Sequence, residues 1–437
     1  MRDLSATNLT ANQKSLERPP RLKLELSTGG VLAATYDISS STNRIISLNH
    51  IEQEWNQVAY IAVNSDPTLA ALDLQGYKGY IYYGYNDAVA GDEYSYCAPL
   101  EVLAQSTPTD FRGSQVQLVT SFALGGVFNF MQVDKASKDY SLESDDARTV
   151  KTLLTQIVEA DINLPFWHCK AYTITFDSED SLIDTYLPAD YFYVSKGEDR
   201  LSAFRKLLKT TKCQARIGND GAIHVFNPKI TGAYDYEYND AVTNHNFFEK
   251  GVRERLVIPN RVYVQSAPSH TTKYYGNAVD TASYTALGRY IDSEIFYIRA
   301  ISNTQCENIA TAKLQHLQVD AERGHGFAPM NCGQEVMDYI KMTDSVASDE
   351  RAGNIGYLQR RYVPGKRFDQ EFRFGALPDA MELAIGVSEG ELSGQQAFDL
   401  AMQAMYEIEA EKMREYVLQK LWVTKQLRIP EGLYDGD

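Results

Sequence analysis

One stretch near the middle of the chain constrains the fold more than any other. Residues 191–227 (YFYVSKGEDRLSAFRKLLKTTKCQARIGNDGAIHVFN) predict a strand, a capped helix and a β-hairpin in succession. Ser195 and Glu198 have capping-box spacing, in which each side chain binds a free amide of the first helical turn. Leucines and a phenylalanine then recur at helical spacing. The GNDG tetrapeptide at 218–221 favours a tight hairpin turn, because Gly, Asn and Asp tolerate positive φ. The chain is therefore expected to contain a small α+β unit.

The region before this unit is predicted to be all β. A short N-terminal arm, residues 1–19, ends at a Pro-Pro pair. Apolar and polar residues then alternate in several short runs that are separated by Gly, Ser and Asn, as in antiparallel strands. The run VQLVTSFALGGVFNFM (116–131) is predicted to add a further strand. We expect residues 20–140 to form a first β-barrel or sandwich.

Helical and β patterns alternate through the next part of the chain. Ser144 is the predicted N-cap of a helix over 146–162, which places residues 141–230 in one α+β domain. From residue 255 the β pattern returns, interrupted by a polar loop at 270–290. A helix is predicted over 304–324, with Gly324 as its C-cap. Residues 231–385 are accordingly predicted to be a second β-barrel or sandwich domain that contains one helix.

The last segment, residues 386–437, is predicted to be one long helix followed by an acidic tail. Ser393 and Gln396 form a capping-box pattern, and no Pro or Gly interrupts residues 395–427. A helix of this length would measure about 48 Å. It would either pack along its own barrel or bind a neighbouring subunit or partner, and the sequence leaves both open. Its broad apolar face is the candidate partner-binding surface: Phe398, Met402, Met405, Tyr406, Met413, Val417 and Leu421.

Charge and hydropathy exclude several classes of protein. A net charge of −16 argues against binding nucleic acid through phosphate neutralisation. No apolar run approaches the roughly 18 residues that a membrane-spanning helix requires. The N-terminal residues have no apolar core typical of a secretory signal, so we expect synthesis in the cytoplasm.

No recognisable catalytic or metal-binding motif occurs in the sequence. The five cysteines lack C-x-x-C spacing, which makes a disulfide framework or a zinc knuckle improbable and favours buried free thiols. The seven histidines are isolated, and His168-Cys169 lies in an apolar run that is expected to be a strand. We therefore predict no enzymatic activity, no cofactor and no metal. Plentiful carboxylates leave a glycosidase-type pair open.

Several phrases, in order along residues 20–377, resemble those of phage tail hub proteins, the baseplate hub or tail-associated proteins of long-tailed phages and related tail-like particles. Each phrase alone is weak, and their shared order carries the resemblance. The phrases are LDLQGYKGYIYYGYND (72–87), PLEVLAQ (99–105), PNRVYV (259–264), PMNCGQEVMDYIKMTD (329–344) and IGYLQRRYVPGKRFDQEFRFG (355–375), with the helix-plus-hairpin of 191–227 between them.

This resemblance implies a structural virion protein. Members of the family form homotrimers in which two β-barrels per subunit make a pseudo-six-fold ring. That ring joins the six-fold tail tube to a three-fold tip or spike, and DNA passes through it without specific binding. A cell-wall-degrading or carbohydrate-binding tail module is the alternative on the enzyme side. A secretion-type spike protein of the same fold is another, but it should continue into an oligonucleotide-binding-like domain and a β-helix needle.

Overall fold

The computed structural model describes residues 1–375, apart from residues 3, 5, 6, 15–17, 40–42, 66, 68–70, 88, 108, 113, 114, 241–244, 248, 252–257, 269, 270 and 323. The chain divides into two compact units, residues 1–387 and 388–437, and every described residue belongs to the first. The predicted C-terminal helix and its apolar face lie outside the described residues.

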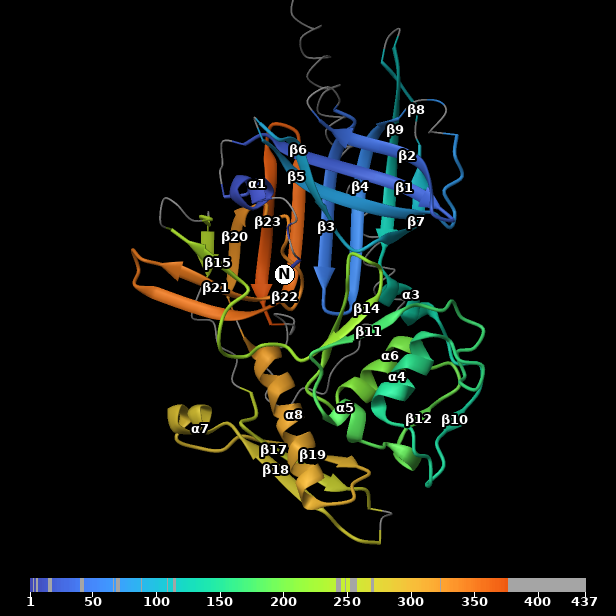
Figure 1. The fold of residues 1–437 in the computed structure, drawn as a ribbon, viewed down its shortest axis with the longest axis vertical. Coiled ribbons are helices and arrows are strands. Elements are labelled where there is room, and N and C mark those ends of the chain that lie inside the picture. The colour runs from blue at the N-terminus through green and yellow to red at the C-terminus, as the bar shows by residue number, and fades with distance from the viewer. Residues whose placement is uncertain are drawn as a thin grey trace, which may run out of the picture. The chain divides into compact units, whose positions relative to one another are not determined.

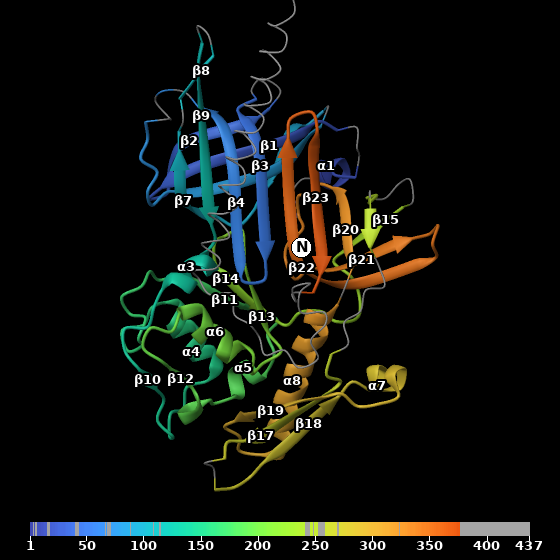
Figure 2. The same cartoon turned by 180° about the vertical axis from the view of Figure 1, so that it is seen from behind.

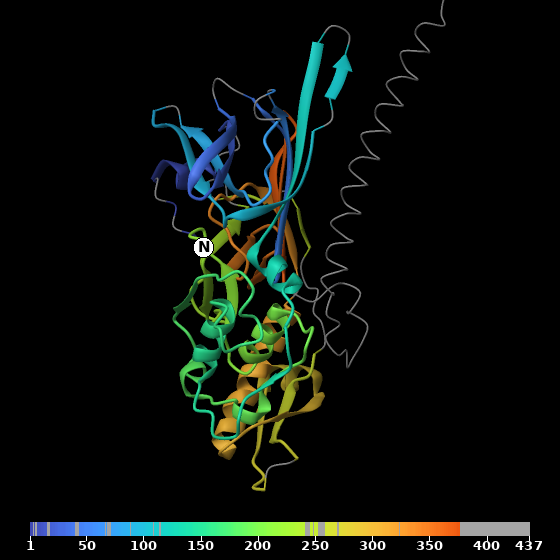
Figure 3. The ribbon, with the colours of Figure 1, turned by 90° about the vertical axis from the view of Figure 1, so that its right-hand side faces the viewer.

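The N-terminal β region follows the alternating pattern of its sequence (Figure 1). A helix, α1 (Thr7–Asn12), precedes it. Its strands are β1 (Pro20–Thr28), β2 (Val31–Ile38), β3 (Ile45–Gln53), β4 (Asn56–Ser65), β5 (Lys78–Asp87), β6 (Gly91–Tyr96), β7 (Leu100–Ser106), β8 (Thr109–Arg112) and β9 (Gln115–Gly125). They pair in the order β3-β4-β9-β7-β5-β1-β2. Figure 3 shows β8 and β9 extending beyond the other strands.

This sheet folds back on itself without forming a complete barrel. Among the described residues, its two ends, β2 and β3, meet through an isolated bridge between Ile38 and Asn43 and a hydrogen bond from Arg44 N to Asp37 O of 2.9 Å. Inward-facing residues of all the long strands still share one core, which includes Leu24, Tyr83 and Leu124. The expected barrel or sandwich is thus a strongly curved sheet whose last seam lacks a ladder.

The second β region continues the same sheet. Its strands are β15 (Tyr236–Asn239), β16 (Glu249–Gly251), β20 (His325–Pro329), β21 (Tyr339–Asp344), β22 (Asp349–Val363) and β23 (Arg367–Phe374). β22 and β23 form a hairpin, and β22 also pairs antiparallel with β3 over Leu48–Gln53. Figure 2 shows β22 between β3 and β23. The two predicted β domains therefore share one 15-stranded sheet among the described residues.

Between them in sequence lies the predicted α+β unit. It contains α3 (Val127–Val133), β10 (Tyr140–Ser141), α4 (Val150–Val158), β11 (Ile174–Asp177), α5 (Leu182–Thr185), η1 (Ala189–Tyr191), β12 (Tyr193–Val194), α6 (Arg200–Leu208), β13 (Gln214–Ile217) and β14 (Ile223–Phe226). The hairpin β13–β14 turns at residues 218–221 as predicted, and β11 pairs parallel to β14. The prediction of a mainly β protein with an α+β part is confirmed.

A second small sheet follows, with a helix on one face. It consists of β17 (Arg261–Ser266), β18 (Tyr275–Val279) and β19 (Asp292–Ile298), with α7 (Thr281–Leu287) between the last two strands. The long helix α8 (Asn303–Ala321) packs on β17 and β18 (Figure 1). Its buried residues, such as Ile309, join Val262 and Val264 in the same core as the α+β unit.

Several predicted boundaries are wrong, each because a nearby residue makes a better terminus. The helix α6 begins after Asp199, not Ser195, because Gly197 at φ +84° turns the chain out of helical geometry. The helix α4 begins after Thr149 rather than Ser144. The helix α8 ends at Ala321, and Gly324 is not its cap.

Three further predictions of local structure are wrong. The strand predicted over 116–131 is present as β9 only as far as Gly125. After Gly126 the run becomes the helix α3, where the Asn129 side chain accepts from Gln57 N at 3.0 Å. The predicted loop at 270–290 contains β18 and α7, the latter capped by Asp280. His168-Cys169 lies in a series of turns, not in a strand.

Candidate functional site

The described fold is organised around a buried segment, residues 330–338, which precedes β21. It lies between β20, which ends at Pro329, and β21, which begins at Tyr339. Met330, Asn331, Cys332 and Gln334 are fully buried, and Asp338 is 1% exposed. Buried irregular backbone must find hydrogen-bond partners elsewhere in the protein. We call residues 330–338 the junction segment.

The N-terminal residues supply part of these partners. Arg2 donates to Cys332 O at 2.5 Å and lies buried with it. Gln13, after α1, accepts from Cys332 N at 3.0 Å. From β5, Tyr85 donates its hydroxyl to Met330 O at 2.9 Å. The N-terminal arm is therefore part of the core.

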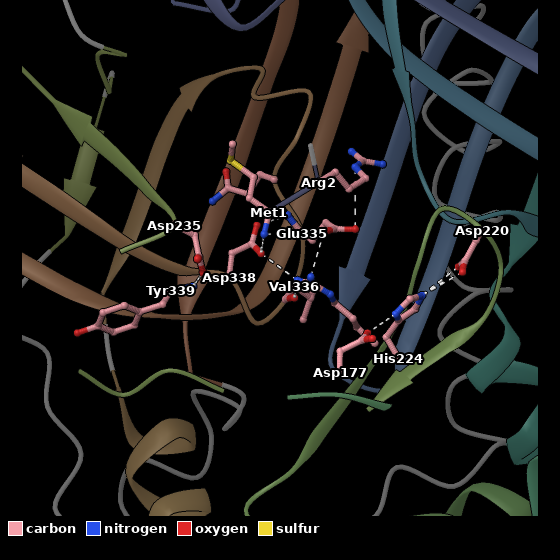
Figure 4. A network of polar contacts seen from close by, with 12 residues as sticks. Met1, Arg2, Asp177, Asp220, His224, Asp235, Glu335, Val336, Asp338 and Tyr339 are labelled. Atoms are coloured by element: carbon pink, nitrogen blue, oxygen red, sulfur yellow. Dashed lines mark hydrogen bonds and ion pairs between the residues drawn. The ribbon is translucent and has the colours of Figure 1, made fainter. Parts of the chain in front are cut away.

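The β13–β14 hairpin reaches the junction segment from the other side. Arg216 donates to Asp338 Oδ1 at 2.9 Å, and its guanidinium lies 3.3 Å from Glu335 Oε2. The ammonium group of Met1 also binds Asp338 (Figure 4). Burial raises the pKa of Glu335, although the charges of Arg216 and Arg2 oppose the shift. This cluster connects three parts of the chain that are far apart in sequence.

A second, deeper cluster lies where β3 pairs with β22. Arg360 on β22 is fully buried and binds both Glu52 on β3 and Gln334 O of the junction segment. Burial alone would raise the pKa of Glu52, but the charge of Arg360 and its hydrogen bond to Glu52 bring the pKa below its usual value. Burial lowers the pKa of His50 to about 4, so the imidazole is neutral at pH 7.

An ionic clip holds the base of the hairpin. His224 on β14 binds Asp177 on β11 through Nδ1 and Asp220 in the turn through Nε2, the latter at 3.1 Å (Figure 4). Partial burial disfavours the charged ring, but the hydrogen bonds to Asp177 and Asp220 raise the pKa of His224. The clip fixes the turn on the neighbouring strand.

The small sheet exposes one of its faces. The side chains there alternate with those that pack on α8, and a hollow of about 310 Å³ lies among them. Tyr275 is 56% exposed and Ile295 is 48% exposed, which is high for such large side chains. We call the following residues the tyrosine face: Tyr263, Gln265, Tyr275, Asn277, Ile295 and Tyr297.

The adjacent His168 and Cys169 do not have the character of a catalytic dyad. Cys169 Sγ lies 3.7 Å from His168 Nε2, but burial raises the pKa of the Cys169 thiol. A nucleophilic cysteine requires a lowered pKa, since the thiolate is the reactive form. A hollow of about 370 Å³ is lined by three carboxylates, but Arg148 binds one of them, Asp146, through both oxygens.

No protein-family model and no curated protein matches the sequence. Among solved structures, the chain is similar to a tail protein from Neisseria meningitidis at 9% identity, with a TM-score of 0.54 and coverage of 83% of this chain and 98% of that one. The chain has the fold of this tail protein. The resemblance to the phage tail hub family is thereby confirmed at the level of the fold.

Two other similar structures score lower. A prophage tail protein from Shewanella oneidensis has 12% identity and a TM-score of 0.47, covering 82% of this chain and 99% of that one. A component of the type VI secretion system of E. coli has 12% identity and a TM-score of 0.43, covering 84% and 79%.

Sequence reasoning did not find the junction segment or the buried charges around it. The only available signal was the density of polar residues in PMNCGQEVMD, which is unusual for a buried strand. Their partners at residues 2, 216 and 360 carry no local pattern that connects them. Among the described residues, no helix is both long enough and apolar enough to cross a membrane.

Proposed function

We propose that this protein is a structural component of a phage tail tip or baseplate, and that it forms the trimeric hub between the six-fold tail tube and the three-fold tip or spike. The observation that carries this proposal is the fold shared with nearly the whole length of a tail protein, 98% of that chain. The protein would be synthesised in the host cytoplasm and incorporated into the virion, with DNA passing through the ring.

The architecture suits a part that transmits force. The junction segment takes hydrogen bonds from the N-terminal arm, the β13–β14 hairpin and β22, so these three parts keep a fixed relation. A hub that joins a tube to a tip must hold its subunits in register while the tail attaches and ejects DNA. Buried hydrogen bonds of this kind help to rigidify a core, although Gln334 Nε2 and Arg360 Nε are buried without a hydrogen-bond partner among the described residues.

We infer that the tyrosine face is covered by a second copy of the chain in the trimer. Residues 261–301 contain four basic and three acidic residues, whereas the whole chain carries a net charge of −16. Like-charged copies repel one another least where the local charge is balanced. Tyrosine is also enriched at protein interfaces, where its ring packs and its hydroxyl finds a polar partner.

Replacing Ile295 and Tyr297 together by Ser should shift purified trimers toward monomers, measured by sedimentation velocity. Val346, 92% exposed beyond β21, offers the control, because Val346→Ser removes an exposed apolar side chain from a turn. Trimers of unchanged stability in the double variant would place the subunit contact elsewhere.

Immunogold labelling of intact particles tests the proposed location. Label confined to the distal end of the tail supports the hub. Absence from particles, with the protein free in the lysate, would overturn it and direct attention to a turnover assay on cell-wall material.

A further inference from the structure

Three potential metal ligands meet in the buried space between β3, β5 and the segment after β6. The imidazole of His50, the carboxylate of Glu52 and the thiol of Cys97 place one ligand atom each within 4.8 Å of the others. His50 and Cys97 are each 1% exposed and Glu52 is 5% exposed. His50 and Glu52 are alternate residues of β3, so their side chains lie on the same face of the strand.

One nitrogen of this cluster has no hydrogen-bond partner among the described residues. His50 Nε2 is buried, and its nearest acidic atom, Glu52 Oε1, is 3.7 Å away, too far for a hydrogen bond. Leaving a buried polar atom unsatisfied costs about 1–3 kcal/mol. Nitrogen and oxygen ligands of one tetrahedral ion, with bonds of about 2.0–2.2 Å, lie about 3.3–3.5 Å apart. The separation of 3.7 Å therefore needs only a small movement of the two side chains to admit an ion.

The surroundings orient each ligand as metal sites require. Tyr83 OH lies 3.0 Å from His50 Nδ1, so a ring protonated at Nδ1 would donate to Tyr83 and keep Nε2 free for a metal. Arg360 binds Glu52 through Oε2, while Oε1 faces His50 and accepts a long hydrogen bond of 3.5 Å from Gln57 Nε2. Such outer hydrogen bonds fix the tautomer and the orientation of metal ligands.

Two buried guanidinium groups, those of Arg2 and Arg360, lie near this cluster and oppose a cation. Coordination by Cys97 would use the thiolate, the form of cysteine that binds metal. The Cys97 thiolate and the Glu52 carboxylate supply two negative charges, but Glu52 also pairs with Arg360, so a divalent ion would leave the cluster with a net positive charge. Binding would release the Cys97 thiol proton to solvent.

We propose that His50, Glu52 and Cys97 form a structural site for a divalent transition-metal ion, best suited to Zn²⁺. A mixed nitrogen, oxygen and sulfur set favours zinc over magnesium or calcium, which take oxygen ligands. This inference is independent of the proposed hub function. The metal would fasten β3 to the chain just before β7.

The test uses the full chain without an affinity tag, expressed in zinc-supplemented medium, dialysed and analysed for metal by mass spectrometry. We expect about one zinc per chain, and loss of that zinc in Cys97→Ser. The control, Cys213→Ser, changes another fully buried thiol and should keep the zinc. Reconstitution with Co²⁺ should give a thiolate-to-cobalt absorption band in the wild type that Cys97→Ser lacks.

The cobalt band separates this site from adventitious binding at surface groups such as the His224 clip, which contains no thiolate. If Cys97→Ser does not fold, the wild type alone still decides: added Zn²⁺ should raise its thermal midpoint relative to EDTA. Three results would each overturn the proposal. They are a zinc content of the wild type no higher than that of the buffer, no cobalt–thiolate band in the wild type, and equal zinc contents in Cys97→Ser and the wild type.

Discussion

At the scale of single residues, two buried histidines carry a measurable pH dependence. Burial lowers the pKa of His50 and of His245 to about 4. In the unfolded chain each pKa would be near 6.5. Below about pH 6.5 these histidines bind protons in the unfolded state but stay neutral in the folded state. The free energy of unfolding therefore decreases as the pH falls from about 6.5 to about 4, the pKa of the folded state.

We expect His50→Gln to remove the part of this loss of stability at low pH that is due to His50. The wild type should lose about 2 kcal/mol through His50 between pH 7 and pH 5, since each pKa unit is worth about 1.4 kcal/mol. Urea unfolding at both pH values, with chelator present, gives the difference. His168→Gln at an exposed position is the control, and an equal acid loss in His50→Gln would show that His50 protonates freely in the folded protein.

At the scale of elements, the local sequence predicts the positions of turns better than the positions of helix ends. The hairpin at 218–221 was predictable because GNDG by itself favours the turn. Two acceptable N-caps lay close together before α6, and only the glycine conformation at residue 197 selects between them. The pairing of β3 with β22 was not predictable, because it joins strands some three hundred residues apart.

The α6 cap can be tested by matched substitutions. Asp199 accepts from Ser202 N at 2.7 Å, so Asp199→Ala should destabilise the protein by about 1 kcal/mol. Ser195→Ala should cost less than about 0.5 kcal/mol, as expected for a surface substitution away from a cap. Chemical denaturation measures both, and the reverse order would restore Ser195 as the cap.

At the scale of the whole molecule, the C-terminal segment, residues 386–437, is the part for which we predict a role in assembly. The sheets, the cores and the junction segment that the structure describes all lie within residues 1–375. The candidate partner-binding face, from Phe398 to Leu421, therefore stays a prediction about assembly.

Deleting residues 393–437 should leave folding intact and abolish assembly. Circular dichroism and thermal unfolding of the shortened chain should match those of the full chain, because its cores are unchanged. Complementation of a phage lacking the gene should then yield no infectious particles. Particles of normal infectivity, or loss of the folded state, would contradict this assignment.

The junction segment also determines which contacts form late in folding. Its partners include Arg2 near one end of the described chain and Arg360 near the other. Contacts between such distant residues form late, because long loops must close first. During translation, which proceeds at about 5–20 residues per second, the segment cannot acquire its last partner until β22 has left the ribosome. A nascent chain therefore cannot complete this buried network before β22 emerges, and a chain truncated before β22 never completes it.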